Sequence, residues 1–173
     1  MKVTELLANE YAPFYAPYIA AFDGGDLIES MEISLHEFIR FVREIPMESH
    51  DYVYAENKWT IKDILQHLID AERIFSYRAL RIARNDKTPL PGFEENNYAA
   101  VANGGKRSIQ ELLTEFSAVR YATLQMFKSF SKDELLRRGI ASNNEISVRA
   151  IGFITIGHVK HHERIFRERY LTI

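Results

Sequence analysis

Apolar residues recur at steps of three and four positions through four long windows of the sequence. In residues 26–45 this stripe consists of Leu27, Met31, Leu35, Phe38, Val42 and Ile45. The windows 60–84, 108–130 and 146–170 show the same period, and all five prolines lie outside the four windows. This period is typical of amphipathic helices that bury one face. The pattern predicts four long helices, whereas strand-like alternation is weak throughout.

Capping signals mark where the helices begin. Three windows open with a residue that can accept a hydrogen bond from the first helical turn, followed three positions later by an acidic residue. The pairs are Asp26 with Glu29, Thr60 with Asp63, and Ser108 with Glu111. A further pair, Ser131 with Glu134, predicts a short helix that stops at Gly139. We expect an all-α fold, a four-helix bundle formed by a single domain of residues 1–173.

The connection between the second and third long helices, residues 85–107, is long for a bundle. A helix of about 25 residues spans about 37 Å, and an extended segment of this length can cover that distance. We therefore expect these two helices to run parallel, with residues 85–107 as the crossover. The crossover and the aromatic segment YAPFYAPY (residues 11–18) could be packing elements or walls of a site. We favour packing for both, with the crossover as the better candidate for a pocket wall.

The composition of the chain excludes several classes of partner and of metal ligand. A net charge of −2 gives no basic surface for nucleic acid or anionic membranes. No apolar run approaches the ~20 residues that span a bilayer, and the first residues lack the features of a secretory signal. We expect a cytoplasmic protein with neither nucleic-acid nor membrane partners. Because the chain has no cysteine, any metal site must use His, Asp or Glu.

The stretch GHVKHHERI, residues 157–165, contains three of the six histidines. On a helical wheel of about 100° per residue, His158 lies within about 40° of the apolar isoleucines. His162 lies about 40° away on the same side, whereas His161 lies about 60° the other way. The wheel therefore selects His158 and His162 to face the core together. Since Val159 follows His158, the H-E-x-x-H motif with its built-in general base is absent.

His67 also lies on the apolar face of its window, with Ile64, Ala71 and Ile74. Inward histidines can simply form hydrogen bonds in a core, or they can bind a divalent cation. Three of them on two helices fit an open site of the kind that catalytic zinc uses. His36 and His50 lack this support, and we interpret His36 as a residue of the surface or of a helix flank and His50 as a loop residue.

Two arginines occupy positions where an apolar residue is expected. Arg78 lies about 20° from His67 on the wheel, and Arg120 falls within the stripe of the third helix. Each could be buried as an ion pair, with Glu72 or Glu115 as partner, or could bind an anionic substrate. Weaker candidates for the site are Asp70, which could orient an imidazole, and the phenols of Tyr77 and Tyr98, while Glu163 faces away.

The run KWTIKDILQHLIDAERIFSYRALRIARND, then LPGF, EFSAVRYATL and the final GH-x-x-HH segment resemble the DinB-like (DinB/YfiT) family. The resemblance covers about residues 20–171. It implies an up-down-down-up four-helix bundle whose metal triad corresponds to His67, His158 and His162. Zinc or nickel is the ion that the resemblance implies.

These patterns lead to one main functional hypothesis and one alternative. The main hypothesis is a metal-dependent enzyme that acts on a small molecule by hydrolysis or by thiol-dependent transfer, with a thiol cosubstrate in the second case. Arg78 and Arg120 would contact the substrate. The alternative is a non-catalytic bundle with a structural or sensing metal, which a fourth protein ligand such as Asp70 or His161 would favour. A homodimer is the assembly that we expect.

Overall fold

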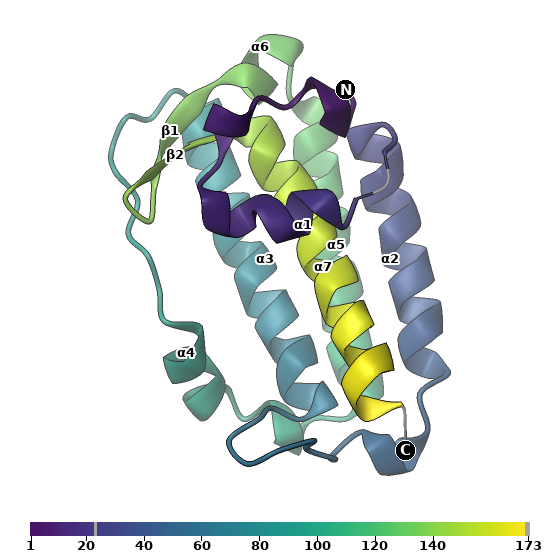
Figure 1. Ribbon diagram of the computed structural model, residues 1–173. Helices are drawn as coiled ribbons and strands as arrows, with labels where there is room; N and C mark the ends of the chain where they lie inside the picture. The colour runs from purple at the N-terminus through teal and green to yellow at the C-terminus, as the bar shows by residue number, and fades with distance from the viewer. Residues whose placement is uncertain (23, 172–173) are drawn as a thin grey trace.

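The computed structural model describes residues 1–22 and 24–171, and long helices dominate it (Figure 1). The long helices are α2 (Leu27–Arg43), α3 (Ile61–Ala83), α5 (Ile109–Ser129) and α7 (Val148–Ile165). A π-helical turn, η6 (Phe166–Tyr170), continues α7. Each long helix lies in a predicted window and begins and ends within two residues of it, when α7 and η6 are taken together. The period of the apolar residues thus correctly predicted the helical framework.

The predicted caps form with one difference. The hydroxyls of Thr60, Ser108 and Ser131 each accept a hydrogen bond from the backbone three residues on, and an acidic side chain returns the bond. Asp26 instead accepts from the amide of Ile28 and binds the N-terminal amine of Met1. The cap of α2 therefore also anchors the start of the chain.

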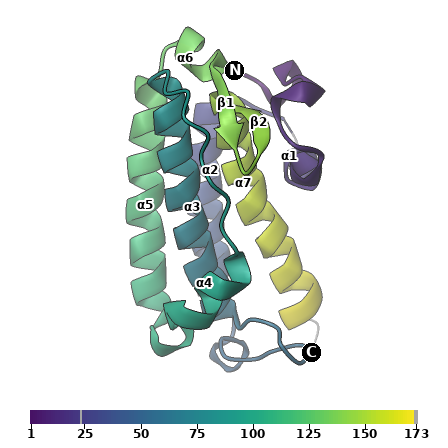
Figure 2. The same cartoon turned by 90° about the vertical axis from the view of Figure 1, so that its left-hand side faces the viewer.

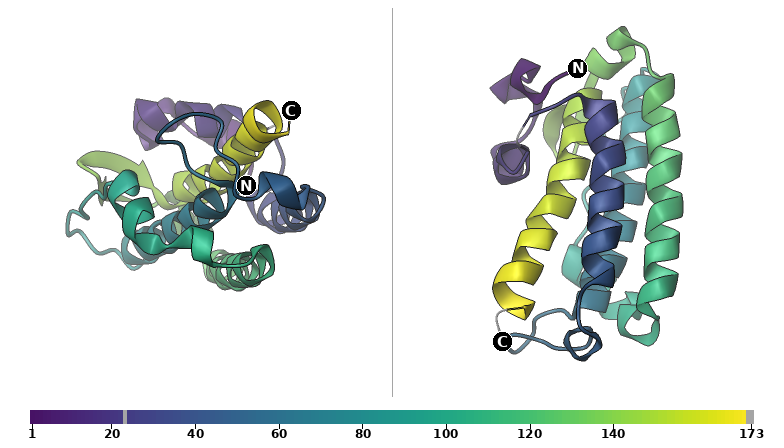
Figure 3. Two further views of the ribbon diagram at one scale, coloured as in Figure 1. Left: turned by 90° about the horizontal axis from the view of Figure 1, so that it is seen from below. Right: turned by 90° about the vertical axis from the view of Figure 1, so that its right-hand side faces the viewer.

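The long helices pack as a bundle in which α3 contacts α5 and α7, and α2 contacts the same two helices. Helices α2 and α3 therefore occupy opposite corners, as the view from below in Figure 3 shows. In Figure 2 the chain leaves the upper end of α3 and descends along the outside of the bundle. It passes through α4 (Glu95–Ala102) and η5 (Gly104–Lys106) before α5 begins. None of the described helices combines the length and apolarity that a membrane span requires.

A β-hairpin departs from the expected all-α fold. Strands β1 (Arg138–Ala141) and β2 (Asn144–Ser147) pair antiparallel after the short helix α6 (Lys132–Leu136). Ser142 and Asn143 form the turn with φ of 50° and 61°, which suits a tight hairpin. The prediction of helix up to Gly139 is wrong because the chain is already extended at Arg137. Strands of four residues are too short for their alternation to stand out in the sequence.

The N-terminal segment lies across the outer face of α7 (Figure 1). It consists of short turns and helices, namely η1 (Val3–Glu5), η2 (Ala8–Glu10), η3 (Pro13–Tyr15) and α1 (Ala16–Ala20). Arg149 at the start of α7 holds it through a buried ion pair with Glu10, which also accepts a hydrogen bond from Ser147 at 2.7 Å. The helical turn η4 (Met47–Ser49) begins the loop that leads from α2 to α3.

A polar layer divides the core between two apolar clusters. Arg120 of α5 is fully buried and forms two hydrogen bonds to the carboxylate of Glu72 on α3, at 2.7 and 2.8 Å. Its remaining terminal nitrogen donates to the hydroxyl of Ser34 on α2 at 2.9 Å. A bidentate pair of this kind satisfies both charges in a medium where either alone would be costly. Arg120 thereby links three helices at mid-height.

The polar layer generates a stability prediction. Glu72→Ala leaves the Arg120 charge buried without its partner, so we expect the free energy of unfolding to fall by about 3–5 kcal/mol. The measurement is urea unfolding followed by circular dichroism. Glu115→Ala is the control, because Glu115 also pairs with arginines but is partly exposed, and its loss should cost at most about 1 kcal/mol. Equal costs for the two variants would contradict the assigned role of Glu72.

Candidate metal centre

Three buried histidines meet between two neighbouring helices. His67 projects from α3, and His158 and His162 project from α7, one turn apart. His158 Nε2 lies 3.1 Å from His67 Nε2 and 3.1 Å from His162 Nε2. Among the described residues this is the one group of three or more potential metal ligands whose ligand atoms all lie within 4.8 Å of one another.

The spacing of the nitrogens suits a divalent ion. With metal–nitrogen bonds of about 2.0–2.1 Å, tetrahedral ligands lie about 3.3 Å apart. The two measured separations of 3.1 Å are close to this value. Three imidazole nitrogens are also a donor set that zinc and nickel accept. The residues present therefore fit a metal ion without rearrangement of the helices.

Burial keeps these imidazoles neutral, which is the form that binds metal. It lowers the pKa of His67 to about 4. The pKa values of His158 and His162 are well below the usual value, mainly through burial and also through repulsion from the neighbouring histidines. The Nε2 atoms of the three imidazoles converge, and in the tautomer with the proton on Nδ1 each Nε2 presents a lone pair that a cation could satisfy.

Aromatic rings surround the triad. The ring centroid of Trp59 lies 4.9 Å from that of His67, and the rings of Tyr18 and Phe75 lie 5.2 and 5.8 Å from His158. The sequence gave Trp59 no role at the site. Its position one residue before the N-cap, on the α3 end that carries His67, was the available signal.

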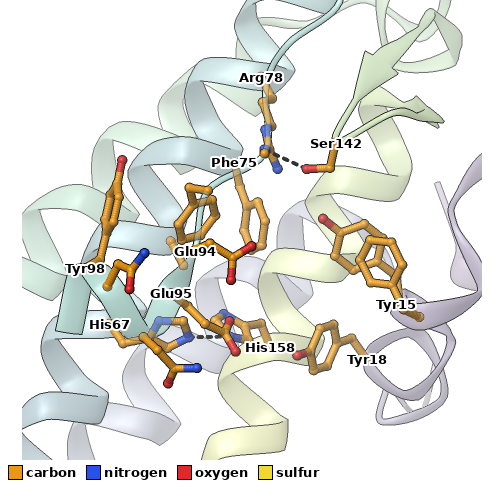
Figure 4. Close-up of a pocket in the computed structure, with 16 residues that line it drawn as sticks. Tyr15, Tyr18, His67, Phe75, Arg78, Glu94, Glu95, Tyr98, Ser142 and His158 are labelled. Carbon is orange, nitrogen blue, oxygen red and sulfur yellow. Dashed lines mark hydrogen bonds between the residues drawn. The ribbon is translucent and has the colours of Figure 1, made fainter. Parts of the chain in front are cut away.

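Two histidines of the triad, His67 and His158, border a cavity of ≈ 800 Å³. His67 and His158 line one end of it, and Arg78 and Ser142 line the other (Figure 4). Its walls come from α3, the N-terminal segment, the hairpin turn and the crossover. We favoured packing for both the crossover and the aromatic N-terminal segment, with the crossover as the better candidate for a wall. Residues 92–98 of the crossover line the cavity, and the N-terminal segment is a wall too.

The two arginines have different surroundings. Arg78 lines the cavity, and its Nη2 atom donates to the carbonyl of Pro91 at 2.7 Å and to the hydroxyl of Ser142 at 3.0 Å. Arg120 does not line the cavity and is occupied by Glu72 and Ser34. For Arg120 the structure supports the ion-pair interpretation and corrects the expectation of substrate contact, because no face of its guanidinium is exposed.

The weaker candidates for the site also differ in their surroundings. Tyr98 lines the cavity, whereas Tyr77 is half exposed and accepts a hydrogen bond from Arg81. Asp70 accepts a hydrogen bond from Gln66 at 3.0 Å rather than from an imidazole. His161 lies beside the triad, with its ring centroid 5.2 Å from that of His162, but it is not part of the ligand cluster. Neither Asp70 nor His161 supplies a fourth ligand in the described residues.

The remaining residues lie where the sequence placed them. His36 is exposed on α2, and His50 lies in the loop before α3. Glu163 pairs with Arg167 on the surface of the last helix and does not line the cavity. By contrast, the sequence gave no site role to Glu94, Glu95 and Ser142, which do line it. Their contribution depends on how the crossover and the hairpin fold back onto the bundle, which periodicity does not encode.

A four-helix bundle with a buried histidine triad beside a cavity defines a class of helical proteins with a potential metal centre. The chain belongs to the DinB superfamily, whose family model matches residues 30–165. No functionally curated protein shows a sequence match to it.

Two solved structures share the fold at low sequence identity. YfiT from Bacillus subtilis, described as "a probable metal-dependent hydrolase with an unusual four-helix bundle topology", superposes with a TM-score of 0.73 at 14% identity. The match covers 82% of each chain. A mycothiol-dependent maleylpyruvate isomerase superposes with a TM-score of 0.66 at 11% identity, covering 80% of this chain and 58% of the isomerase.

Gly157 provides a test of how the cavity wall is held. A Cβ atom at this position would lie 1.9 Å from the carbonyl oxygen of Tyr18, so α1 packs directly on the backbone of α7. We expect Gly157→Ala to push α1 away and to lower the free energy of unfolding by about 1–3 kcal/mol, as overpacking does. Chymotrypsin should then cleave the segment from Tyr11 to Tyr18 faster than in the wild type.

Gly105→Ala is the matched control. A Cβ atom there would lie 4.0 Å from the carboxylate of Asp63, an ordinary contact, so cleavage should be unchanged. Identical protease resistance of Gly157→Ala and the wild type would show that α1 does not need this close approach.

Proposed function

We propose that the protein is a metal-dependent enzyme that acts on a small molecule, by hydrolysis or by thiol-dependent transfer. His67, His158 and His162 are the proposed ligands, and zinc or nickel is the proposed ion. The observation that carries the proposal is the convergence of three neutral imidazoles, two of which line a cavity large enough for a small molecule. The descriptions of the two structural neighbours, a probable hydrolase and a mycothiol-dependent isomerase, support the same class of chemistry.

The proposal assigns a task to each part of the site. Bound at the triad, a divalent ion would supply Lewis-acid activation of a carbonyl, a water or a thiol. The aromatic rings of Trp59, Phe75 and Tyr18 hold the imidazoles and limit the access of water. Glu94 and Glu95, the carboxylates of the cavity wall, are placed to accept a proton from a bound molecule. Arg78 is the proposed polar contact to the substrate.

Several finer features belong to the same proposal. The up-down-down-up order of the helices follows from the resemblance and agrees with the path of the crossover in Figure 2. The single domain of residues 1–173 remains a prediction from the length of the chain. The homodimeric assembly and the cytoplasmic location remain predictions from the sequence.

Metal content tests the ligand assignment. We expect about one divalent ion per chain in gently purified protein, as one three-histidine site implies. His67→Ala, His158→Ala and His162→Ala should each lose most of it, measured by inductively coupled plasma mass spectrometry. His161→Ala should keep the metal, since His161 lies outside the cluster. A metal-free His161→Ala protein, with His162→Ala still loaded, would overturn the assignment.

Removal of the metal separates an enzyme from the structural alternative. Because two apolar clusters and the Arg120 ion pair do not involve the ion, a chelator should leave the helical circular dichroism largely unchanged. Trp59 is the single tryptophan and lies against His67, so adding Ni²⁺ or Co²⁺ to the chelated protein should quench its fluorescence. His67→Ala should show no such quenching. Loss of helix on chelation would favour a structural metal.

A further inference from the structure

Arg78 differs from the other buried arginines of the described residues in having no acidic partner. Arg78, Arg120 and Arg149 are all less than one-tenth exposed, at 3%, 0% and 7%. Arg120 pairs with Glu72, and Arg149 pairs with Glu10. Arg78 forms hydrogen bonds to neutral groups, and in residues 1–22 and 24–171 no carboxylate forms an ion pair with it. A buried charge without a counter-charge is costly, so its place in the cavity needs an explanation.

The free donors of Arg78 point to that explanation. Two of its protein hydrogen bonds, to Pro91 and Ser142, use Nη2, and the phenol of Tyr15 also forms a side-chain hydrogen bond with the guanidinium. Of the five N–H groups of the guanidinium, two are therefore left without a protein acceptor. In the described part of the chain the buried side-chain nitrogen and oxygen atoms without a partner are on His161 and His162. The unused donors of Arg78 are therefore not sealed within protein, and they border the cavity. Tyr15, the other polar neighbour, carries a neutral phenol, since burial raises its pKa although the guanidinium lowers it in part.

The same cavity joins Arg78 to the histidines. The two lie eleven residues apart on α3, about 16 Å along the helix, and within about 20° of the same face. Figure 4 shows Arg78 and Ser142 at one end of the cavity and His67 and His158 at the other. Between them the walls are largely aromatic, formed by Phe14, Tyr15, Tyr18, Phe75, Phe93 and Tyr98. A ligand that reaches both ends must be elongated, and an apolar body suits its middle.

The charged side chains along the cavity favour one orientation of the ligand. Arg78 is the one arginine or lysine among the residues that line it, and a single guanidinium fork matches a singly charged carboxylate. Glu94 and Glu95 line the crossover side, nearer the histidines, and would repel an anion placed there.

We propose that Arg78 and Ser142 form a carboxylate subsite for an elongated substrate whose uncharged reacting group lies at the histidine end. This inference deepens the proposed function and rests on it for the reacting end alone. The carboxylate subsite itself depends only on Arg78, Ser142 and the shape of the cavity.

Bifunctional probes test the subsite in the zinc-loaded protein. Suberic acid monohydroxamate has a metal-binding group at one end and a carboxylate at the other, and its methyl ester lacks the charge. By isothermal titration calorimetry we expect the acid to bind about tenfold more tightly than the ester, the usual effect of a charged hydrogen bond. Succinic acid monohydroxamate is too short to span the cavity and should show no such advantage over its own ester.

Variants assign the effect to Arg78. In Arg78→Gln the acid and the ester should bind equally, while Arg81→Gln, which changes a neighbouring arginine paired with Asp86 outside the cavity, should keep the difference. Equal binding of suberic acid monohydroxamate and its ester to the wild type would overturn the proposal, whether or not the variants fold. An equal advantage for the succinic probe would overturn the requirement for length.

Comparing the binding of octanoate with that of methyl octanoate separates a failure of the carboxylate subsite from a failure of the metal proposal. If the hydroxamates bind no better than octanoate, the metal proposal fails. The carboxylate subsite is then judged by octanoate alone, which should bind the wild type more tightly than methyl octanoate and lose that preference in Arg78→Gln. If octanoate shows no preference over its ester while the hydroxamates bind through the metal, the subsite fails and the metal proposal stands.

Discussion

Polar groups buried in a helical bundle must find partners, and the structure meets this constraint in three ways along one helix. Helix α3 carries His67, Glu72 and Arg78, all buried. Glu72 is satisfied within the protein by Arg120, which joins three helices at the middle of the core. His67 meets two further imidazoles, and the three together could hold a cation. Arg78 is only partly satisfied, by neutral oxygens. From Glu72 through His67 to Arg78, less of the hydrogen-bonding capacity of the side chain is satisfied within the protein. The capacity to bind a ligand increases in the same order.

The histidine triad and most of the cavity lining come from different kinds of element. The triad lies on α3 and α7, whose packing against the rest of the bundle fixes the imidazoles at one spacing. One wall of the cavity is α3, and the others come from the N-terminal segment, the crossover and the hairpin, which lie outside the four long helices. Two small-residue contacts hold these additions close, since Gly157 admits the backbone of Tyr18 and Gly139 admits β1 against Ile82.

The sequence predicted the framework because periodicity and capping are local properties. The four windows, the caps at Thr60 and Ser108, and the inward faces of His67, His158 and His162 all follow from residues within a few turns of one another. The hairpin was missed because two four-residue strands carry too few alternating positions. The two arginines could not be told apart either. The wheel placed both on inner faces, but only the packing of three helices shows that Arg120 meets Glu72 and that Arg78 meets a cavity.

Local sequence patterns specify the positions of the triad, whereas long-range packing specifies the lining of the cavity. This difference explains how the fold can support different reactions. Under the proposed function, a triad fixed by two helices supplies one activating centre, whichever bond is to be broken. Selectivity then comes from Arg78 of α3 and from the segments outside the long helices, which contribute Glu94 and Glu95, Tyr15 and Tyr18, and Ser142. These segments can change in length and composition without disturbing the polar layer or the triad, because neither depends on them for its hydrogen bonds. Low identity between proteins of this fold is therefore compatible with a common centre, and the chemistry of each member has to be sought in the walls.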